Sequence, residues 1–225
     1  MKISEIFYSV QGEGKYIGEP AVFVRLFGCP VNCSFCDSRF SIEGTKWEEL
    51  KIREVVNRVK KYNCNNVVIT GGEPFMQRSQ LSELVDILYI ENFMVFIETA
   101  AVYTIDNSHE RSLFNSCKLV TISPKESWAR QIGLSEYVKV VRDNYMIVPD
   151  RTILKFVYEN EGSEEFIKNF IKAGDFRVPV YILPQSRNRE ELVKNLPVVI
   201  EYCKRENFIV SDRLHIVAWD DKRGV

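Results

Sequence analysis

The sequence predicts an α/β protein built on a mainly parallel β-sheet, arranged as an open, partial barrel with helices on its outside. Short runs rich in Val, Ile and Phe alternate with longer stretches whose apolar residues recur at helical spacing. This alternation is typical of βαβ units, whose crossover helices pack on the sheet. The 225 residues contain no Ser/Gly-rich linker, low-complexity tract or clear repeat, so we expect a single domain over 1–225.

Six segments have the composition of strands. They are 21–27 (AVFVRLF), 66–70 (NVVIT), 93–99 (FMVFIET), 118–123 (KLVTIS), 153–158 (ILKFVY) and 179–184 (PVYILP). In a parallel sheet or partial barrel, the groups that bind ligands collect at the carboxyl ends of such strands.

Four stretches between these strands carry apolar residues at helical spacing: 52–62, 81–91, 164–173 and 189–206. Pro197 lies within the last of them. Because proline has no backbone N–H and its ring clashes with the preceding turn, we expect a kink there or a break into two shorter helices.

Charge and hydropathy exclude several classes of function. Thirty Lys and Arg against 31 Asp and Glu give a net charge of −1, so there is no electrostatic reason to expect nucleic acid or a membrane as a partner. The N-terminal stretch MKISEIFYSVQGEG lacks the apolar segment of a secretory signal, and apolar runs such as 93–97 are too short to span a bilayer. We therefore expect a cytoplasmic protein, in which a tight cysteine cluster indicates metal binding or catalysis.

Three cysteines lie within eight residues on the loop after the first predicted strand: Cys29, Cys33 and Cys36. A structural zinc site needs four ligands. The other candidates, His109, His215, Cys64 and Cys117, do not stand at typical zinc-finger spacing. Three thiolates without a fourth partner favour a 4Fe–4S cluster with one iron left open, over zinc or a chance clustering of buried cysteines.

The cysteine loop resembles that of the radical S-adenosylmethionine superfamily, which shares this spacing with an aromatic residue directly before the last cysteine. Phe35 fills that position. TGGEP at 70–74 resembles the Gly-Gly-Glu motif of the superfamily, although such a stretch alone is more often a tight turn. The resemblance implies a partial barrel of the radical-SAM type, a 4Fe–4S cluster, and S-adenosylmethionine bound at the open iron as the source of a 5′-deoxyadenosyl radical.

Other stretches resemble one family within that superfamily, 7-carboxy-7-deazaguanine synthase. They are SVQGEGKYIGEPAVFVRLFGC (9–29), CDS (36–38), ET (98–99), SPK (123–125) and LHIVAWDDKRGV (214–225). The resemblance implies the conversion of 6-carboxy-5,6,7,8-tetrahydropterin to 7-carboxy-7-deazaguanine with loss of ammonia, a radical ring contraction of the 7-deazapurine (queuosine) pathway. Because the radical carries the chemistry in this lyase reaction, no side chain is assigned as catalytic.

The resemblance also implies the residues of the site. S-adenosylmethionine is expected at Phe35, Cys36, Asp37, Gly72, Glu73, Ser123, Pro124 and Lys125, and the pterin at Val10, Gln11, Gly12, Glu13, Arg25, Thr70, His215 and Val225. Arg25 is expected to bind the carboxylate of the substrate as a two-donor fork. Taken alone, Gln11 and Glu13 would be ordinary turn residues and Arg25 a surface ion pair. His215 fits a core histidine almost as well.

Asp37 and Ser38 stand where the family has Asp-Thr, whose hydroxyl binds Mg²⁺ in members that need it, and they are the predicted magnesium ligands. Serine keeps the hydroxyl but lacks the methyl group that restricts the rotamer, which argues against a tight dependence on magnesium. The family further implies a homodimer and a flavodoxin- or ferredoxin-type reductant.

Three other functions stay open from the sequence. A glycyl-radical-enzyme activase has the same cysteine motif, but QGEG and SPK weigh against it. A plain iron–sulfur electron carrier leaves TGGEP unexplained. A zinc-stabilised binding module lacks its fourth ligand.

Overall fold

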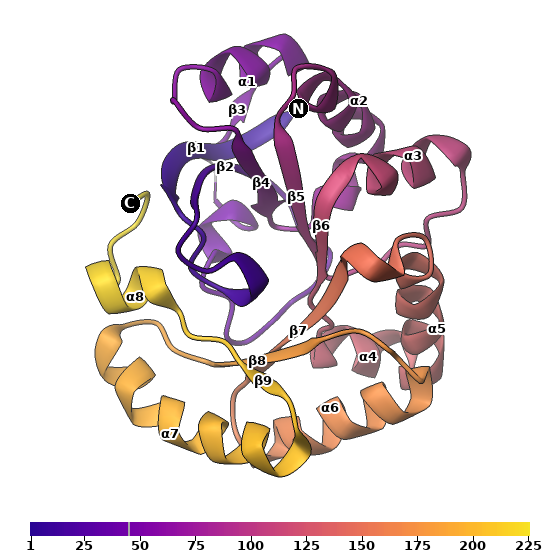
Figure 1. Cartoon of the computed structure of the whole chain (residues 1–225), viewed down its shortest axis with the longest axis vertical. Helices are drawn as coiled ribbons and strands as arrows, with labels where there is room; N and C mark the ends of the chain where they lie inside the picture. The colour runs from indigo at the N-terminus through magenta and orange to yellow at the C-terminus, as the bar shows by residue number, and fades with distance from the viewer. Residues whose placement is uncertain (45) are drawn as a thin grey trace.

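The computed structural model describes residues 1–44 and 46–225, and the strands of this part of the chain form one open sheet in the order β3-β1-β2-β4-β5-β6-β7-β8-β9 (Figure 1). They are β1 (Lys2–Val10), β2 (Pro20–Leu26), β3 (Glu48–Glu49), β4 (Asn66–Gly71), β5 (Met94–Thr99), β6 (Cys117–Ile122), β7 (Thr152–Tyr158), β8 (Val180–Pro184) and β9 (Ile209–Val210). Strand β1 is antiparallel to β2 and β3, and each neighbouring pair from β2 onward is parallel. The predicted fold class is confirmed.

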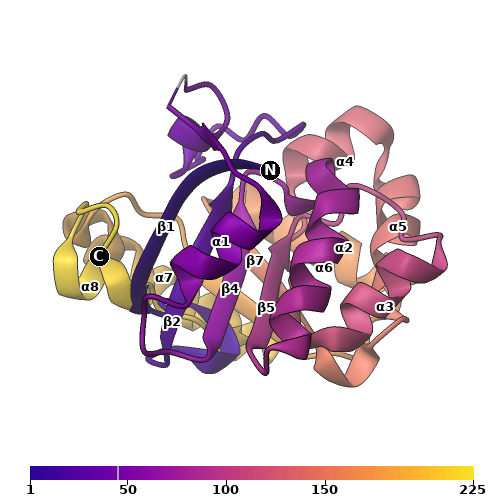
Figure 2. The same cartoon turned by 90° about the horizontal axis from the view of Figure 1, so that it is seen from above.

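The helices surround the curved sheet on its outer side (Figures 1 and 2). They are α1 (Ile52–Val59), α2 (Arg78–Ile90), α3 (Ser108–Ser116), α4 (Glu126–Ile132), α5 (Leu134–Tyr145), α6 (Glu161–Gly174), α7 (Arg189–Glu206) and α8 (Leu214–Trp219). Short 3₁₀ turns occupy Gly14–Tyr16, Arg39–Ser41, Pro74–Gln77 and Pro149–Arg151. The last helix, α8, leads the C-terminal segment back to β1, at the other side of the sheet (Figure 1).

Successive residues of each strand face opposite sides of the sheet, and both sides are apolar where the strands begin. Residues such as Val24, Ile69 and Ile97 pack with the helices in the main core. The interior side carries a smaller buried cluster formed by Ala21, Phe23, Val68, Phe96, Leu119 and Ile153. This second cluster closes the interior of the partial barrel at the amino ends of the parallel strands.

Two residues further along each parallel strand from β2 to β7, toward its carboxyl end, the side chains on the interior side of the sheet are polar. The side chains at this level, which we call the polar layer, are Glu5, Arg25, Thr70, Glu98, Thr121 and Lys155. The sheet register aligns Arg25 with Thr70 on β4, and Glu98 with Thr121 on β6. The antiparallel β1 extends the layer, because Glu5 pairs with Arg25. The polar layer therefore lies directly on the buried apolar cluster, which forms the apolar floor of the barrel interior.

All six predicted strands form, with ends that differ from the prediction by one residue at most. The four predicted helices correspond to α1, α2, α6 and α7. Of the two outcomes expected at Pro197, the break into two helices is wrong, because α7 runs through the proline as one helix, and the kink stays a prediction. Pro197 and Val193, whose carbonyl would accept the missing N–H bond, both lie on the exposed face. Water can therefore replace the absent donor.

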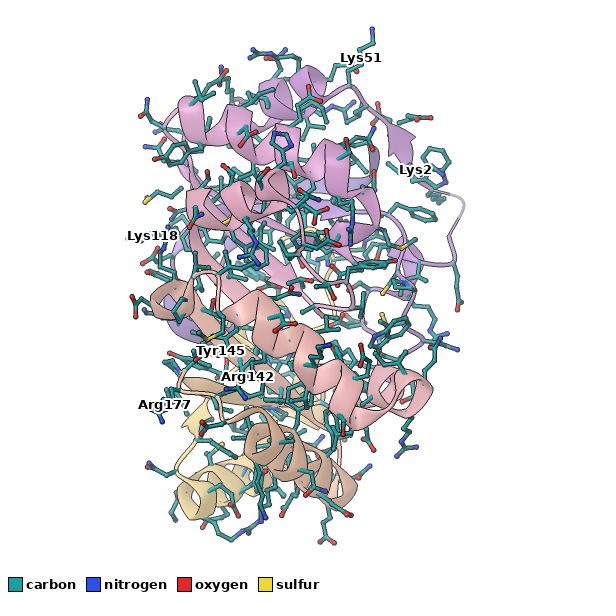
Figure 3. The ribbon with its side chains drawn as sticks, turned by 90° about the vertical axis from the view of Figure 1, so that its right-hand side faces the viewer. Lys2, Lys51, Lys118, Arg142, Tyr145 and Arg177 are labelled. Carbon is teal, nitrogen blue, oxygen red and sulfur yellow. The ribbon has the colours of Figure 1, made fainter. Side chains whose placement is uncertain are left out.

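Figure 3 shows the side chains on the helix-covered side of the molecule. Tyr145, near the end of α5, packs edge-on against Phe176 in the segment before β8, with 5.6 Å between ring centroids. Lys118, Arg142 and Arg177 are exposed on this side. Among the described helices, none is both long and apolar enough to cross a membrane.

Candidate active site

A cavity of about 550 Å³ opens above the polar layer, at the carboxyl ends of the parallel strands. Loops from distant parts of the chain line it, as expected for such a sheet. It brings together most of the predicted site residues: Val10, Gln11, Gly12, Glu13, Arg25, Cys29, Cys33, Phe35, Cys36, Asp37, Ser38, Thr70, Gly72, Ser123, Lys125, His215 and Val225. Two predicted cofactor residues, Glu73 and Pro124, are not part of its lining.

The three cysteines of the loop after β2 are free thiols on the wall of this cavity. Burial raises the pKa of Cys29 to about 12, and burial also raises the pKa of Cys36. Charge on Cys33 and Cys36 also acts on Cys29, and charge on Cys33 acts on Cys36, which places the three sulfur atoms in one neighbourhood. Because a metal ligand must be a thiolate, loading of a metal cluster here has to release protons.

The TGGEP turn supports the start of the cysteine loop from below. The N–H of Gly72 donates to the carbonyl of Leu26 (3.1 Å), and the N–H of Glu73 donates to the carbonyl of Gly28 (2.8 Å). A Cβ atom at Gly72 would overlap the carbonyl of Gly28 and crowd the Cβ of Cys29. Glycine at 72 therefore permits the close contact between the two motifs.

The carboxylate of Glu73 is fully buried and faces the protein, not the cavity. One oxygen accepts bonds from the Thr99 hydroxyl (2.7 Å) and the Phe75 N–H (3.1 Å), and the other accepts the Ala100 N–H (2.8 Å). Burial raises the pKa of Glu73. Its side chain fixes the end of β5 beneath the site.

The predicted cofactor residues of the SPK motif meet the aromatic residue of the cysteine loop. The Lys125 ammonium donates to the Ser123 hydroxyl (2.7 Å) and lies 6.0 Å from the ring centroid of Phe35. The N–H of Lys125 donates to the hydroxyl of Tyr137 on α5 (3.1 Å). A cation and a hydroxyl are thereby held next to an aromatic face, on the side of the cavity that carries the cysteines.

The predicted substrate residues Gln11 and Thr70 both reach Glu98 in the polar layer. The Gln11 amide donates to one carboxylate oxygen (3.2 Å) and the Thr70 hydroxyl to the other (3.2 Å). Glu98 belongs to the ET stretch of β5, but the sequence alone assigned it no role. Together the three side chains present amide, hydroxyl and carboxylate groups to the cavity.

Arg25 is held in place by an acidic neighbour. Its Nε donates to Glu5 (2.7 Å) and its Nη1 to the hydroxyl of Ser38 (3.4 Å). Within the described residues, its Nη2 makes no hydrogen bond. Arg25 therefore does form an ion pair, and the free edge of its guanidinium still faces the cavity.

Two buried cations that the sequence did not single out surround the predicted residue Glu13. Lys155 lies 2.7 Å from Glu13 and 3.3 Å from Glu98, and Arg213 lies 2.8 Å from Glu13. Burial by itself would raise the pKa of Glu13, but Lys155 and Arg213 outweigh it and hold the pKa well below its usual range. Lys155 carried a usable signal, since it is the one charge in the strand ILKFVY, whereas nothing in the sequence around Arg213 marks it.

The C-terminal segment covers the N-terminal loop of the site. The N–H of Leu214 donates to the carbonyl of Gly12 (2.9 Å), and a Cβ at position 12 would overlap the ring of His215. Burial lowers the pKa of His215. Further on, Arg223 bonds Glu5 (3.0 Å) and stacks on Phe40, 3.2 Å from the ring centroid. The tail that ends at Val225 is thereby tied across the cavity.

Comparison with known proteins identifies the family. The profile described as the Radical SAM superfamily matches residues 24–125. A 7-carboxy-7-deazaguanine synthase of Pyrobaculum aerophilum is 34% identical over 227 residues, which covers 100% of this chain and 97% of the relative. This chain belongs to the 7-carboxy-7-deazaguanine synthase family. A second member, from Aquifex aeolicus, is 32% identical and covers 90% of this chain and 85% of its own length.

A solved structure of QueE from Escherichia coli has the same fold as this 7-carboxy-7-deazaguanine synthase family member. It superposes with a TM-score of 0.70 at 24% identity and covers 95% of this chain and 94% of the other. The likeness bears on the fold alone, and it agrees with the open, mainly parallel sheet.

Membership in the radical SAM superfamily implies a 4Fe–4S cluster and S-adenosylmethionine, and the cavity fits both. Three free thiols share one wall, and the Ser123–Lys125 pair stands beside Phe35. In the described part of the chain, no three His, Cys, Asp or Glu side chains are gathered around one point that would hold a lone metal ion.

The two predicted magnesium ligands lie together but are already engaged. One carboxylate oxygen of Asp37 accepts the hydroxyl of Ser38 (2.7 Å), and the other is paired with Arg213. Burial would raise the pKa of Asp37, but Arg213 overcomes it and lowers the pKa. The charge of Asp37 is thus compensated by the protein, and the pair does not form a ready magnesium site.

Proposed function

We propose that this chain is a 7-carboxy-7-deazaguanine synthase that converts 6-carboxy-5,6,7,8-tetrahydropterin to 7-carboxy-7-deazaguanine with loss of ammonia. The names of its relatives and their coverage of the whole chain support the assignment. The observation that carries it is a single cavity shared by the cysteine loop and the polar layer. A radical source and a polar substrate can thereby lie against each other within one site.

Cys29, Cys33 and Cys36 would hold the cluster. The backbone at Gly72, the side chains of Ser123 and Lys125 and the ring of Phe35 would hold S-adenosylmethionine. When bound, these groups supply the radical that begins the reaction. The protein positions both ligands and keeps water away, and the apolar layer under the polar layer closes the site from beneath.

The polar layer suits a pterin. A pterin presents N–H donors and a carbonyl along one edge and, in this substrate, a carboxylate at the other end. Glu98 and the Gln11 and Thr70 groups that it binds match the donor–acceptor edge, and the free edge of Arg25 matches the carboxylate. Glu13, His215 and the C-terminal carboxylate on Val225 would complete the pocket, together with the backbone of Val10 and Gly12.

Five finer points stay predictions: the single domain and the cytoplasmic location come from the sequence, and the homodimer, the reductant and magnesium come from the family resemblance. We expect the whole chain to act as one domain, in a homodimer, in the cytoplasm, with a flavodoxin- or ferredoxin-type reductant. Magnesium would be held by the Ser38 hydroxyl, water and bound substrate, because Asp37 is paired with Arg213.

Anaerobic reconstitution with iron and sulfide, followed by mass spectrometry of the reaction products, tests the proposal. We expect 7-carboxy-7-deazaguanine and ammonia from the carboxypterin, with S-adenosylmethionine and a chemical reductant present. A variant with alanine at Cys29, Cys33 and Cys36 should form no product. Cleavage of S-adenosylmethionine without any pterin product would overturn the substrate assignment and return the glycyl-radical-activase alternative. A stable cluster that cleaves no S-adenosylmethionine would return the electron-carrier alternative.

A further inference from the structure

Each thiol of the cysteine loop has a hydrogen-bonding partner, but the three partners are of two kinds. The sulfur of Cys29 accepts the backbone N–H of Val31 (3.4 Å). The sulfur of Cys36 is bonded by the backbone of Ser38, again two residues further on. Donors of this kind come from the turn of the loop itself, and any residue other than proline supplies them.

Cys33 is different because its partner is a side chain from a distant element. The hydroxyl of Ser127, in the first turn of α4, lies 3.6 Å from the Cys33 sulfur across 94 residues of sequence. Cys33 is buried and packs with Val31, Ala100 and Val102. A hydrogen bond in such apolar surroundings is electrostatically stronger than one in water.

The direction of this bond follows from the chemistry of the loop. In the free protein either atom can be the donor. A cysteine that binds iron is a thiolate, which has no proton to give. With a cluster on Cys33, Ser127 must therefore donate and the sulfur must accept.

We propose that Ser127 is a positioning residue that raises the reduction potential of the cluster through its bond to Cys33; the inference rests on the proposed function of the cysteine loop. Uptake of one electron increases the negative charge on the cluster and its thiolates, and a hydrogen bond donated to one of these sulfurs stabilises the reduced state more than the oxidised state. Hydrogen bonds to sulfur are among the determinants of iron–sulfur potentials. Ser127 is the side-chain donor among the three bonds described, so it is the one that substitution can remove.

The test is a redox titration of the reconstituted protein without S-adenosylmethionine, with dithionite as the electron source, mediator dyes, and electron paramagnetic resonance as the readout. In Ser127→Ala we expect the equilibrium constant for reduction to fall about tenfold, a shift of about 59 mV to more negative potential for one electron. Ser127→Thr keeps a hydroxyl and should stay close to the wild-type potential.

Ser34→Ala is the matched control, because Ser34 lies on the same loop but its hydroxyl donates to Glu159 (3.4 Å). An unchanged potential in Ser127→Ala, or an equal shift in Ser34→Ala, would overturn the inference. If the alanine variant retains no cluster, Ser127→Val and Ser127→Thr give the same comparison, since they match in shape and differ in the hydroxyl. A wild-type protein that binds no 4Fe–4S cluster would contradict the proposed function itself, a result that the iron content reports separately.

Discussion

Replacing Lys155 by methionine removes the buried cation that separates two partly buried carboxylates. Lys155 is 7% exposed at its side chain and lies 2.7 Å from Glu13 and 3.3 Å from Glu98. Methionine keeps the length and the apolar stem, so little packing is lost. Glu13 retains Arg213, but Glu98 is left facing Glu13 without a cation between them. Breaking a buried ion pair on one side costs about 3–5 kcal/mol.

We therefore expect Lys155→Met to lower the free energy of unfolding by about 3–5 kcal/mol. For a chain of this length, where 1 kcal/mol shifts Tm by roughly 2–4 °C, the melting temperature should fall by about 6–20 °C. Urea unfolding of the cluster-free protein, followed by circular dichroism, measures the change. Adding Glu98→Gln to the same chain should recover part of the loss, because the unpaired charge is then removed.

Lys204→Met is the matched control. Lys204 pairs with Glu201 on the exposed face of α7, and both side chains are largely in solvent. Surface substitutions of this kind usually change stability by less than about 0.5 kcal/mol. A loss below about 1 kcal/mol in Lys155→Met, or a double variant no more stable than Lys155→Met, would refute the reasoning.

The remaining predictions concern substrate binding, the cysteine loop and pH. Arg25→Lys should lower kcat/KM for the carboxypterin by about ten- to a hundredfold, because a lysine cannot reproduce the planar fork; unchanged kinetics in a folded variant would return Arg25 to a purely structural ion pair. Gly72→Ala should reduce the iron bound after reconstitution, because its Cβ would push the cysteine loop away at Gly28, and a full complement of iron would contradict this. Burial lowers the pKa of His215 from 6.5, so as the pH falls below that value the unfolded chain gains a proton that the folded chain resists, and stability falls. His215→Gln should remove this part of the loss of unfolding free energy between pH 7 and pH 5.5. Equal slopes of unfolding free energy against pH in wild type and variant would show that His215 does not contribute.

The sheet was predictable from sequence because its parallel strands are buried on both sides. Such strands read as continuous apolar runs, and NVVIT or FMVFIET needs no partner to be recognised. Strand β1 was missed because KISEIFYSV mixes charged and apolar residues, and it becomes a strand through its pairing with β2. The two-residue strands β3 and β9 carry no local signal at all.

The parts of the site that consist of short sequence motifs were predictable. The parts that depend on contacts between residues far apart in the sequence were not. The cysteines form one compact motif, whose spacing alone favoured an iron–sulfur cluster, and TGGEP forms another, whose chemistry was indicated by its resemblance to the superfamily motif. The bonds from Lys155 and Arg213 to Glu13 join residues 142 and 200 positions apart. Only the fold brings such groups together, and a lone cation in a sequence does not name its partner. Glu73 was recognised from its motif, but the sequence did not show that its buried side chain bonds Thr99 and Ala100 and so holds the end of β5 in place.

The stacking of the polar layer on the apolar floor has a consequence for how this enzyme can be altered. Positions 25, 70, 98, 121 and 155 sit on five adjacent strands, and each projects inward from a backbone whose opposite face is anchored by the helices. Single replacements there change the polar groups that face the cavity and leave the helix-packed side of each strand unchanged, although replacing a paired residue such as Lys155 also lowers stability. A one-residue deletion within a strand does the reverse, because it exchanges the two faces and drives a charge such as Glu98 into the helix-packed core. Point substitutions in the polar layer should therefore adapt the site to new substrates far more readily than changes in strand length.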